Sequence, residues 1–255
     1  MQEEIYKLML KYFFKANPKF DQNFIVDKRV IEKIIETLDL KKDDIVLEIG
    51  GGTGNLTKEL IKKCKVIVVE KDPLMVEILK NELPQDNLEI INKDFLEIDL
   101  NKLNFTKIAG LIPYSISHNI LEKINATKPA VIVVQKEFAE KLVAVNGFQN
   151  YVSSSVLAQS YGDIRLIKNI GKSSFYPKPN VKSTIIEIIP KIHKQDERYN
   201  KFVKTIFRYS NKNLQNALKY LETKKDYKID NELFKVKVKQ LSTDEIMKLY
   251  KQIYN

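Results

Sequence analysis

Residues 45–72 decide the fold, and they read I-V-L-E-I-G-G-G-T-G-N-L-T-K-E-L-I-K-K-C-K-V-I-V-V-E-K-D. The run Ile45–Ile49 is short, apolar and rich in β-branched residues, as buried strands are. A glycine cluster and a segment with apolar residues at helical spacing follow, and a second β-branched run, Val66–Val69, ends in Glu70. This order of strand, tight turn, helix and strand predicts an open parallel sheet.

The glycine cluster and Glu70 together predict a nucleoside-binding site. Gly50 and Gly52 allow the backbone to approach a ligand closely where the helix begins. Glu70 stands 20 residues after Gly50, at the end of the second strand, where an acidic side chain can accept hydrogen bonds from ribose hydroxyls. We therefore expect Gly50, Gly52 and Glu70 to bind a nucleoside.

The glycine spacing indicates the kind of nucleoside. A dinucleotide fingerprint, G-x-G-x-x-G, would place a third glycine at position 55, where this chain has Asn55. The cluster is also not followed by the G-K-S/T sequence of a phosphate-binding loop. These differences argue against NAD and ATP and favour a ligand without phosphates. S-adenosylmethionine is the common case, and we expect it as the cofactor.

Composition limits the remaining possibilities. At 255 residues, with 44% apolar and 30% charged residues, the chain is long enough for one large globular domain and a small one. The single cysteine, Cys64, excludes a disulfide framework, and with only two histidines it argues against a metal site. No apolar run approaches the roughly 18 residues of a membrane span, and the acidic start lacks the features of a targeting peptide. We expect a cytoplasmic protein that contacts no membrane.

The charge of the chain predicts a polyanionic partner. The net charge is +10, and residues 192–255 contribute +7 of it, from 15 Lys and Arg against 8 Asp and Glu. A basic segment of this kind favours nucleic acid as the partner, although lysine-rich helices are also simply solvated faces.

Three further residues stand where a ligand at the strand ends could meet them. Asn23 lies in an apolar segment, and Asp94 and Tyr114 follow the third and fourth predicted strands. An aromatic ring at a strand end can stack on a base, and a carboxylate can accept from an adenine amine. Each residue also has a simpler interpretation, because Asn23 and Tyr114 fit turns and Asp94 fits a helix cap. The residues alone leave both interpretations open.

The remaining patterns predict a two-part chain. Further strands are expected at Leu88–Ile91, Lys107–Leu111, Ala130–Gln135, Asp163–Asn169 and Lys182–Ile189, the last two with the alternation of antiparallel strands. The tail changes to helical periodicity over Glu197–Tyr209, Asn213–Leu221 and Thr243–Ile253, and a capping box, Ser242-x-x-Glu245, opens the last helix. We expect an α/β domain over 1–190 and an all-α domain over 191–255, with a linker at about Pro190–Asp196.

Several motifs together resemble those of one family. They are Q-N-F-I-V-D (22–27), V-L-E-I-G-G-G-T-G-N-L-T (46–57), V-V-E-K-D (68–72), K-D-F-L (93–96), L-I-P-Y-S-I-S (111–117), V-V-Q-K-E-F-A-E-K-L (133–142) and F-Y-P-K-P-N-V-K-S (175–183). In this order they resemble the rRNA adenine dimethyltransferases of the KsgA type. The resemblance implies a Rossmann-like seven-stranded methyltransferase sheet, a small helical RNA-binding domain and S-adenosylmethionine as cofactor. It also implies small-subunit rRNA or a pre-ribosomal particle as the partner of a monomeric protein.

The resemblance implies roles for the cofactor-binding residues. Asn23 and the backbone at Ile25 match the family's residues over the methionine end of the cofactor. Gly50 matches the first glycine of the family's loop, Glu70 its ribose acid and Asp94 its adenine contact. These roles agree with what the glycine loop, Glu70 and Asp94 suggest by themselves.

The catalytic residues are also implied by the resemblance. Leu111, Ile112, Pro113 and Tyr114 occupy the family's N-L-P-Y motif, and Tyr114 and Phe175 match two aromatics that sandwich the target adenine.

The chain departs from the family's pattern in three places: Leu111 stands where asparagine is usual, Asp21 where glycine is usual, and Val152-Ser153 where glycine-arginine is common. An adenine amine is a poor nucleophile because its lone pair is delocalised into the ring. Two acceptors, the asparagine oxygen and the next carbonyl, would direct that lone pair at the methyl group. Leu111 leaves only the Ile112 carbonyl, and losing one such partner typically costs about 10² to 10³ in rate.

The main hypothesis is S-adenosylmethionine-dependent methylation, ending in dimethylation, of adenine 6-amino groups in small-subunit rRNA. The alternative is a weak or inactive paralogue that binds rRNA as a ribosome-assembly factor, since Leu111 removes a catalytic acceptor. A small-molecule methyltransferase fits poorly with the basic tail.

Overall fold

The computed structural model describes residues 1–124, 128–191, 196–221 and 231–254 and divides into two compact units. The first unit contains Met1–Lys136 and Arg165–Ile189, and the second contains Glu137–Ile164 and Pro190–Asn255. The predicted linker, Pro190–Asp196, lies partly outside the described residues. The division into domains 1–190 and 191–255 stays a prediction.

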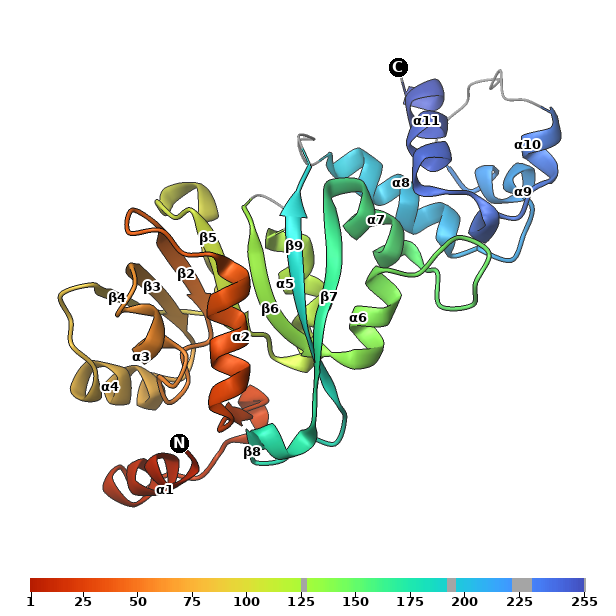
Figure 1. The fold of residues 1–255 in the computed structure, drawn as a ribbon. Helices are drawn as coiled ribbons and strands as arrows, with labels where there is room; N and C mark the ends of the chain where they lie inside the picture. Colours follow the sequence, from red (N-terminus) through yellow and green to blue (C-terminus); the bar gives the residue numbers. More distant parts are fainter. Residues whose placement is uncertain (125–127, 192–195, 222–230, 255) are drawn as a thin grey trace. The chain divides into compact units, whose positions relative to one another are not determined.

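A seven-stranded sheet organises the first unit (Figure 1). Its strands are β2 (Ile45–Ile49), β3 (Lys65–Glu70), β4 (Leu88–Asn92), β5 (Lys107–Leu111), β6 (Ala130–Gln135), β7 (Gly162–Ile170, whose first three residues belong to the second unit) and β9 (Ser183–Pro190, whose last residue belongs to the second unit). They lie in the order β4-β3-β2-β5-β6-β9-β7. The pairs from β4 to β6 are parallel, and β6 and β9 are antiparallel. The β-branched runs therefore predicted the sheet correctly.

Helices bury the apolar residues of the sheet. The first unit contains α1 (Gln2–Lys11), α2 (Lys28–Leu38), α3 (Thr57–Leu60), α4 (Pro73–Glu82) and α5 (Ser117–Ile124). Asp27 caps the start of α2 by accepting from the Arg29 N–H, and Val30, Ile31 and Ile34 on its inner face are buried with the sheet. On α4, Leu79 joins the same core. The helix predicted after the glycine cluster is present as α3 but has only 4 residues.

A two-stranded sheet that the sequence patterns did not predict joins two loops. Strand β1 (Phe24–Ile25) pairs in antiparallel register with β8 (Phe175–Tyr176). The Val26 N–H donates to the Ser174 carbonyl at 2.9 Å, which extends the junction. The segment around Asn23 is thereby fixed next to the segment that follows Phe175.

The second unit is built from helices. They are α6 (Lys136–Leu142, whose first residue belongs to the first unit), α7 (Ser153–Tyr161), α8 (Glu197–Phe207), α9 (Leu214–Leu218), α10 (Asn231–Lys235) and α11 (Thr243–Tyr254). The predicted capping box is confirmed: the Ser242 N–H donates to Glu245 Oε2 at 2.8 Å, and the Glu245 N–H donates to Ser242 Oγ at 3.3 Å. Within the described ranges, no helix has the length and apolar character needed to cross a membrane.

Candidate functional site

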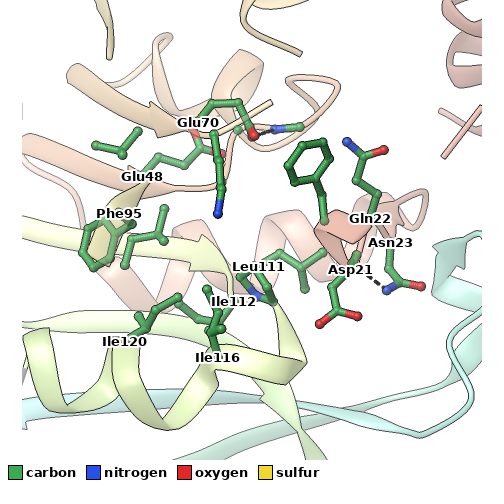
Figure 2. Close-up of a pocket in the computed structure, with 18 of the residues that line it drawn as sticks. Asp21, Gln22, Asn23, Glu48, Glu70, Phe95, Leu111, Ile112, Ile116 and Ile120 are labelled. Carbon is green, nitrogen blue, oxygen red and sulfur yellow. Dashed lines mark hydrogen bonds between the residues drawn. The ribbon is translucent and has the colours of Figure 1, made fainter. Parts of the chain in front are cut away.

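A cavity of about 220 Å³ opens at the carboxyl ends of β2, β3, β4 and β5 (Figure 2). Strand β2 is followed in the sheet by β3 on one side and β5 on the other, so the cavity lies where the strand order reverses, as open α/β sheets dictate. Its lining includes ten of the eleven predicted site residues: Asn23, Ile25, Gly50, Gly52, Glu70, Asp94, Leu111, Ile112, Pro113 and Tyr114.

The glycine loop forms one wall of this cavity. Gly52 has a φ of +51°, and a Cβ at this position would lie 3.2 Å from the Phe24 ring. Its N–H donates to Glu70 Oε2 at 2.9 Å. A Cβ at Gly50, where φ is +75°, would lie 3.7 Å from the Leu111 carbonyl oxygen. Glycine therefore permits the tight turn and brings the loop close to the L-I-P-Y segment.

Glu70 is a buried carboxylate with an 8% exposed side chain. Burial raises its pKa, while backbone N–H groups oppose that rise. Oε1 accepts from the Asp72 N–H at 2.8 Å, and Oε2 accepts from Gly52. Each oxygen keeps a further lone pair, so the group is fixed in place and can still accept from ribose hydroxyls.

Asp94 caps a turn and also lines the cavity. It caps the short 3₁₀ turn Phe95–Glu97, because Oδ1 accepts from the Leu96 N–H at 2.9 Å, and it also lines the cavity. Oδ2 lies 2.8 Å from the Lys71 ammonium, which lowers the pKa of Asp94. The side chain is therefore an ionised acceptor in the cavity wall.

The Asn23 segment is held by side-chain amides. Asn23 Nδ2 donates to the Asp21 carbonyl at 2.9 Å, and Asn55 Nδ2 donates to the Ile25 carbonyl at 2.6 Å. Asn55, which occupies the position of the missing third glycine, therefore ties the glycine loop to strand β1. Sequence reasoning did not assign this role.

Glu48 is a cavity residue that the sequence interpretation quoted but did not assign. It is 1% exposed, and its Oε2 has no hydrogen-bond partner among the described residues. Burial raises its pKa to about 8, and the negative charge of Glu70 adds to the rise. The carboxyl group is therefore largely protonated at neutral pH. Its signal in the sequence was a carboxylate inside an otherwise apolar strand run.

The L-I-P-Y turn leaves β5 and faces the cavity. The Ile112 N–H donates to the Val133 carbonyl at 3.1 Å, and Ser117 Oγ donates to the Pro113 carbonyl at 3.1 Å. The Ile112 carbonyl accepts no hydrogen bond from the described part of the chain. Tyr114 bonds through its hydroxyl to Ser183 Oγ, and burial raises the pKa of the Tyr114 phenol.

Phe175 is the predicted site residue that the structure does not bring into the cavity. Its side chain is 2% exposed and belongs to the core cluster that contains Ile25 and Val30. The stacking role implied for Phe175 would require it to leave this core, because strand β8 directs the ring inward. The residues that follow it, Pro177–Val181, instead line a second cavity of about 450 Å³.

The second cavity adjoins the first. Asp21, Gln22, Asn23, Tyr114 and Ser115 line both. These five residues therefore form the boundary between the first cavity, at the strand ends, and the second cavity, which the Pro177–Val181 loop lines.

The geometry fits a nucleoside. Carboxylate acceptors stand at the ends of β3 and β4, and the glycine loop follows the neighbouring strand β2, so all three face one cavity. A sheet of this order with such a cavity defines a Rossmann-like methyltransferase. Comparison with known proteins supports this class and narrows it.

The ribosomal RNA adenine dimethylase family model matches residues 13–255. The chain belongs to this family. It is 37% identical over 225 residues to a probable ribosomal RNA small subunit methyltransferase A of Pyrococcus furiosus, covering 86% of this chain and 81% of the relative. It is 38% identical to a ribosomal RNA small subunit methyltransferase A of Mycoplasma capricolum, covering 94% of this chain and 98% of the relative.

Solved structures agree with this assignment. A dimethyladenosine transferase from Plasmodium falciparum superposes with a TM-score of 0.78 at 26% identity, covering 89% of this chain and 95% of that one. The 23S rRNA methyltransferase ErmE superposes with a TM-score of 0.65 over 91% of this chain and 100% of that one; at 24% identity it supports the fold alone.

Proposed function

We propose that this protein transfers methyl groups from S-adenosylmethionine to the 6-amino groups of adenines in small-subunit rRNA, ending in dimethyladenine. The observation that carries the proposal is the single cavity in which the glycine loop, Glu70 and Asp94 meet the L-I-P-Y turn. Membership of the adenine dimethylase family supports the choice of adenine as the target.

The cofactor's place follows from the donors and acceptors on the cavity wall. Glu70 would accept from the ribose hydroxyls, Asp94 from the adenine amine, and Asn23 would cover the methionine end. When bound, the cofactor supplies a methyl group already activated by its cationic sulfur. The protein's contribution is therefore positioning, which alone can provide about 7 to 11 kcal/mol of barrier reduction.

The target adenine would enter through the second cavity. Tyr114, on the boundary between the two cavities, would stack on the base, and the Pro177–Val181 loop would form the opposite wall. The Ile112 carbonyl would accept from the amine. Phe175 contributes to this arrangement by holding the β1–β8 junction in the core.

The basic tail would provide phosphate contacts. Residues 192–255 carry a net charge of +7, and in the second unit Lys212 lies over the stacked rings of Tyr209 and Tyr220. Cations beside aromatic faces suit RNA, since they meet both phosphates and bases. The proposal includes a monomer that acts on pre-ribosomal particles in the cytoplasm.

Single-turnover methyl transfer tests the proposal. Unmethylated small-subunit particles would be mixed with the protein and labelled S-adenosylmethionine, and the adenine products resolved by mass. We expect methyladenine followed by dimethyladenine. Particles whose target adenines are already dimethylated are the control and should accept no label. Binding to the particles without transfer would contradict the proposal and favour the assembly-factor alternative.

A further inference from the structure

Transfer to an adenine amine requires control of its two N–H groups. The lone pair becomes available to the methyl carbon only when acceptors draw both hydrogens out of the reaction path. The L-I-P-Y turn presents one acceptor, the Ile112 carbonyl, because Leu111 has an aliphatic side chain in the cavity wall. A second acceptor must come from another element if the enzyme is to work well.

Asp21 is a carboxylate that lies at this turn. It belongs to the loop after the 3₁₀ turn Pro18–Phe20, far from Leu111 in the sequence. Its Oδ2 accepts from the Ser115 N–H at 2.8 Å, three residues after Ile112. Its Oδ1 accepts no hydrogen bond from any residue in the described ranges. One oxygen therefore anchors the side chain to the turn and the other is free to accept.

The position of Asp21 between the two cavities suits this role. It lines both the cofactor cavity and the cavity under the Pro177–Val181 loop. Figure 2 shows Asp21 beside Asn23, on the side of the cavity that carries the Gln22 segment. The pKa of the Tyr114 phenol is raised by burial and further by the charge of Asp21, as expected for a carboxylate near the base-stacking position. The transferred methyl must cross this same boundary.

We propose that Asp21 is a catalytic residue: its free carboxylate oxygen accepts a hydrogen bond from the target amine and takes the place of the side-chain acceptor that Leu111 lacks. This inference rests on the proposed function. In the transfer step the amine lone pair forms the new N–C bond, the C–S bond breaks with its electron pair staying on sulfur, and one amine proton leaves. Asp21 receives that proton and returns it to solvent, to which its half-exposed side chain has access.

The backbone at Asp21 makes a clean test possible. Its φ of +53° lies in the left-handed region, which glycine adopts without strain and asparagine tolerates. Asp21→Gly should therefore fold at least as well as the wild type. Asp39 offers a matched control, because it also has a left-handed φ, of +45°, and lies at the exposed end of α2 outside both cavities.

Asp21→Asn distinguishes a side chain that accepts a hydrogen bond from the target amine from one that only anchors the L-I-P-Y turn through the Ser115 N–H. An asparagine has one oxygen, so if that oxygen keeps the Ser115 bond, its NH₂ group faces the target amine and repels it. A residue that only anchored the turn would tolerate this change. A residue that accepts from the amine would not.

The experiment measures single-turnover transfer to unmethylated small-subunit particles by Asp21→Gly, Asp21→Asn, Leu111→Asn, the double variant Asp21→Gly/Leu111→Asn and Asp39→Gly. We expect Asp21→Gly and Asp21→Asn each to slow transfer by about 10²-fold with unchanged cofactor affinity. Leu111→Asn should change the wild-type rate by less than about tenfold but speed Asp21→Gly by about 10²-fold, because it restores the missing acceptor. Asp39→Gly should match the wild type.

Three results would overturn the inference. Asp21→Gly within about threefold of the wild type would show that the carboxylate is not used. Full activity of Asp21→Asn would reduce Asp21 to an anchor for the turn. Equal acceleration of wild type and Asp21→Gly by Leu111→Asn would show that the two positions act independently. A wild type that transfers no methyl would overturn the proposed function itself, and the inference with it.

Discussion

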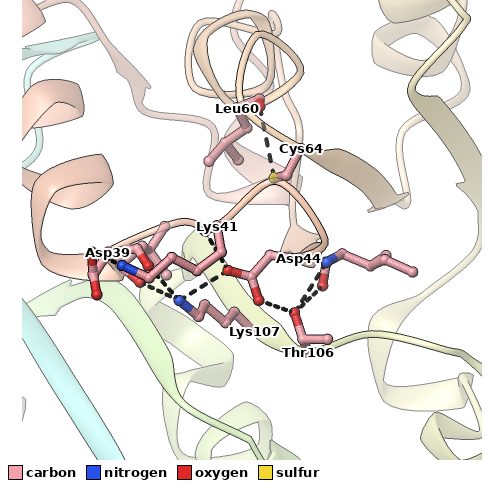
Figure 3. Close-up of polar contacts among 9 residues, drawn as sticks. Asp39, Lys41, Asp44, Leu60, Cys64, Thr106 and Lys107 are labelled. Carbon is pink, nitrogen blue, oxygen red and sulfur yellow. Dashed lines mark hydrogen bonds and ion pairs between the residues drawn. The ribbon is translucent and has the colours of Figure 1, made fainter.

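Asp44 and Glu48 stand four residues apart, at the amino and carboxyl ends of strand β2, and their pKa values move in opposite directions. At the amino end, Asp44 accepts from Thr106 Oγ1 at 2.6 Å and the Lys41 N–H at 2.7 Å, and lies 3.0 Å from the Lys107 ammonium (Figure 3). Burial alone would raise the pKa of Asp44, but these hydrogen bonds and Lys107 lower it.

At the carboxyl end, Glu48 is buried without a cation, and its Oε2 has no partner among the described residues. The difference distinguishes the two ends of the parallel strands, which we call the amino edge and the carboxyl edge of the sheet. The amino edge satisfies its charges internally, which joins β2 to β5 and serves stability. The carboxyl edge keeps the Glu48 carboxyl group without a full set of partners beside a cavity, which costs stability and leaves that group available to a ligand.

Glu48→Gln should stabilise the folded protein, and this should be the largest effect of the series. Between pH 4.5 and about 8 the unfolded chain loses the Glu48 proton while the folded chain keeps it, so the free energy of unfolding falls as pH rises. The variant lacks this titration and should be more stable than the wild type by about 4 kcal/mol at pH 8, with the difference vanishing below pH 4.5. Urea unfolding from pH 4.5 to 8.5 measures it.

The control for this experiment is Glu89→Gln, at an exposed position of β4. Its stability should follow the wild type within about 0.5 kcal/mol across the same range. If Glu48→Gln showed no pH-dependent gain, the carboxyl edge would be no more strained than the amino edge, and the comparison would fail.

Lys107→Met, at the amino edge, should lower the free energy of unfolding, whereas Glu48→Gln raises it. The side chains of Lys107 and Asp44 are 17% and 11% exposed, so removing the cation leaves a poorly solvated charge. We expect a loss of about 3 kcal/mol at neutral pH, which shrinks on acidification as Asp44 is protonated. Denaturant unfolding of Lys107→Met, with and without Asp44→Asn, measures it, and the double variant should recover most of the loss.

Lys102→Met is the matched control, since Lys102 and its partner Asp99 are 82% and 49% exposed. That change should cost less than about 0.5 kcal/mol. An equal loss in both lysine variants would mean that burial is not what makes the amino edge stabilising.

Glu70→Ala should weaken S-adenosylmethionine binding by about 10²-fold, the value of hydrogen bonds to a charged acceptor. Calorimetry on the folded variant measures this. Glu82→Ala removes a carboxylate that bonds Lys11 and Tyr12 outside the cavity, and it should leave cofactor affinity unchanged. Equal affinity in wild type and Glu70→Ala would remove Glu70 from the cofactor site.

The amino-acid pattern predicted the carboxyl edge well because its elements are local. A β-branched run followed by glycines defines strand and loop together, and Glu70 and Asp94 each follow a strand directly. The ends of parallel strands meet at one edge, so these residues had to converge. All the predicted strands are present, because each rests on a local run of β-branched or alternating residues.

What the pattern missed depends on contacts between distant segments. Strands β1 and β8 are 2 residues each, about 150 residues apart, too short for any periodicity. Their pairing buries Phe175, which the motif alone placed beside the target base. Helix α7 has a serine-rich start with no apolar period, and it was not predicted. The meeting of Asp21 with the Leu111 turn is likewise visible only in three dimensions.

Tyr114→Ala should have the smallest effect of the series. It tests whether separate residues at the carboxyl edge bind the cofactor and the target base. Tyr114 lines both cavities, and stacking on a base is worth about 1 to 3 kcal/mol. We expect kcat/KM for rRNA methylation to fall about tenfold to thirtyfold while cofactor affinity stays within about twofold.

Tyr114→Phe separates the ring from its hydroxyl. It keeps the stacking face but loses the bond to Ser183, so it should retain most of the activity. Single-turnover transfer with varied particle concentration, beside calorimetry with the cofactor alone, distinguishes the two contributions. Parallel losses in Tyr114→Ala and Tyr114→Phe would assign the effect to the hydroxyl. A matching loss of cofactor affinity would show that Tyr114 belongs to the cofactor half of the cavity, because a residue that only stacks on the target base has no contact through which to weaken cofactor binding.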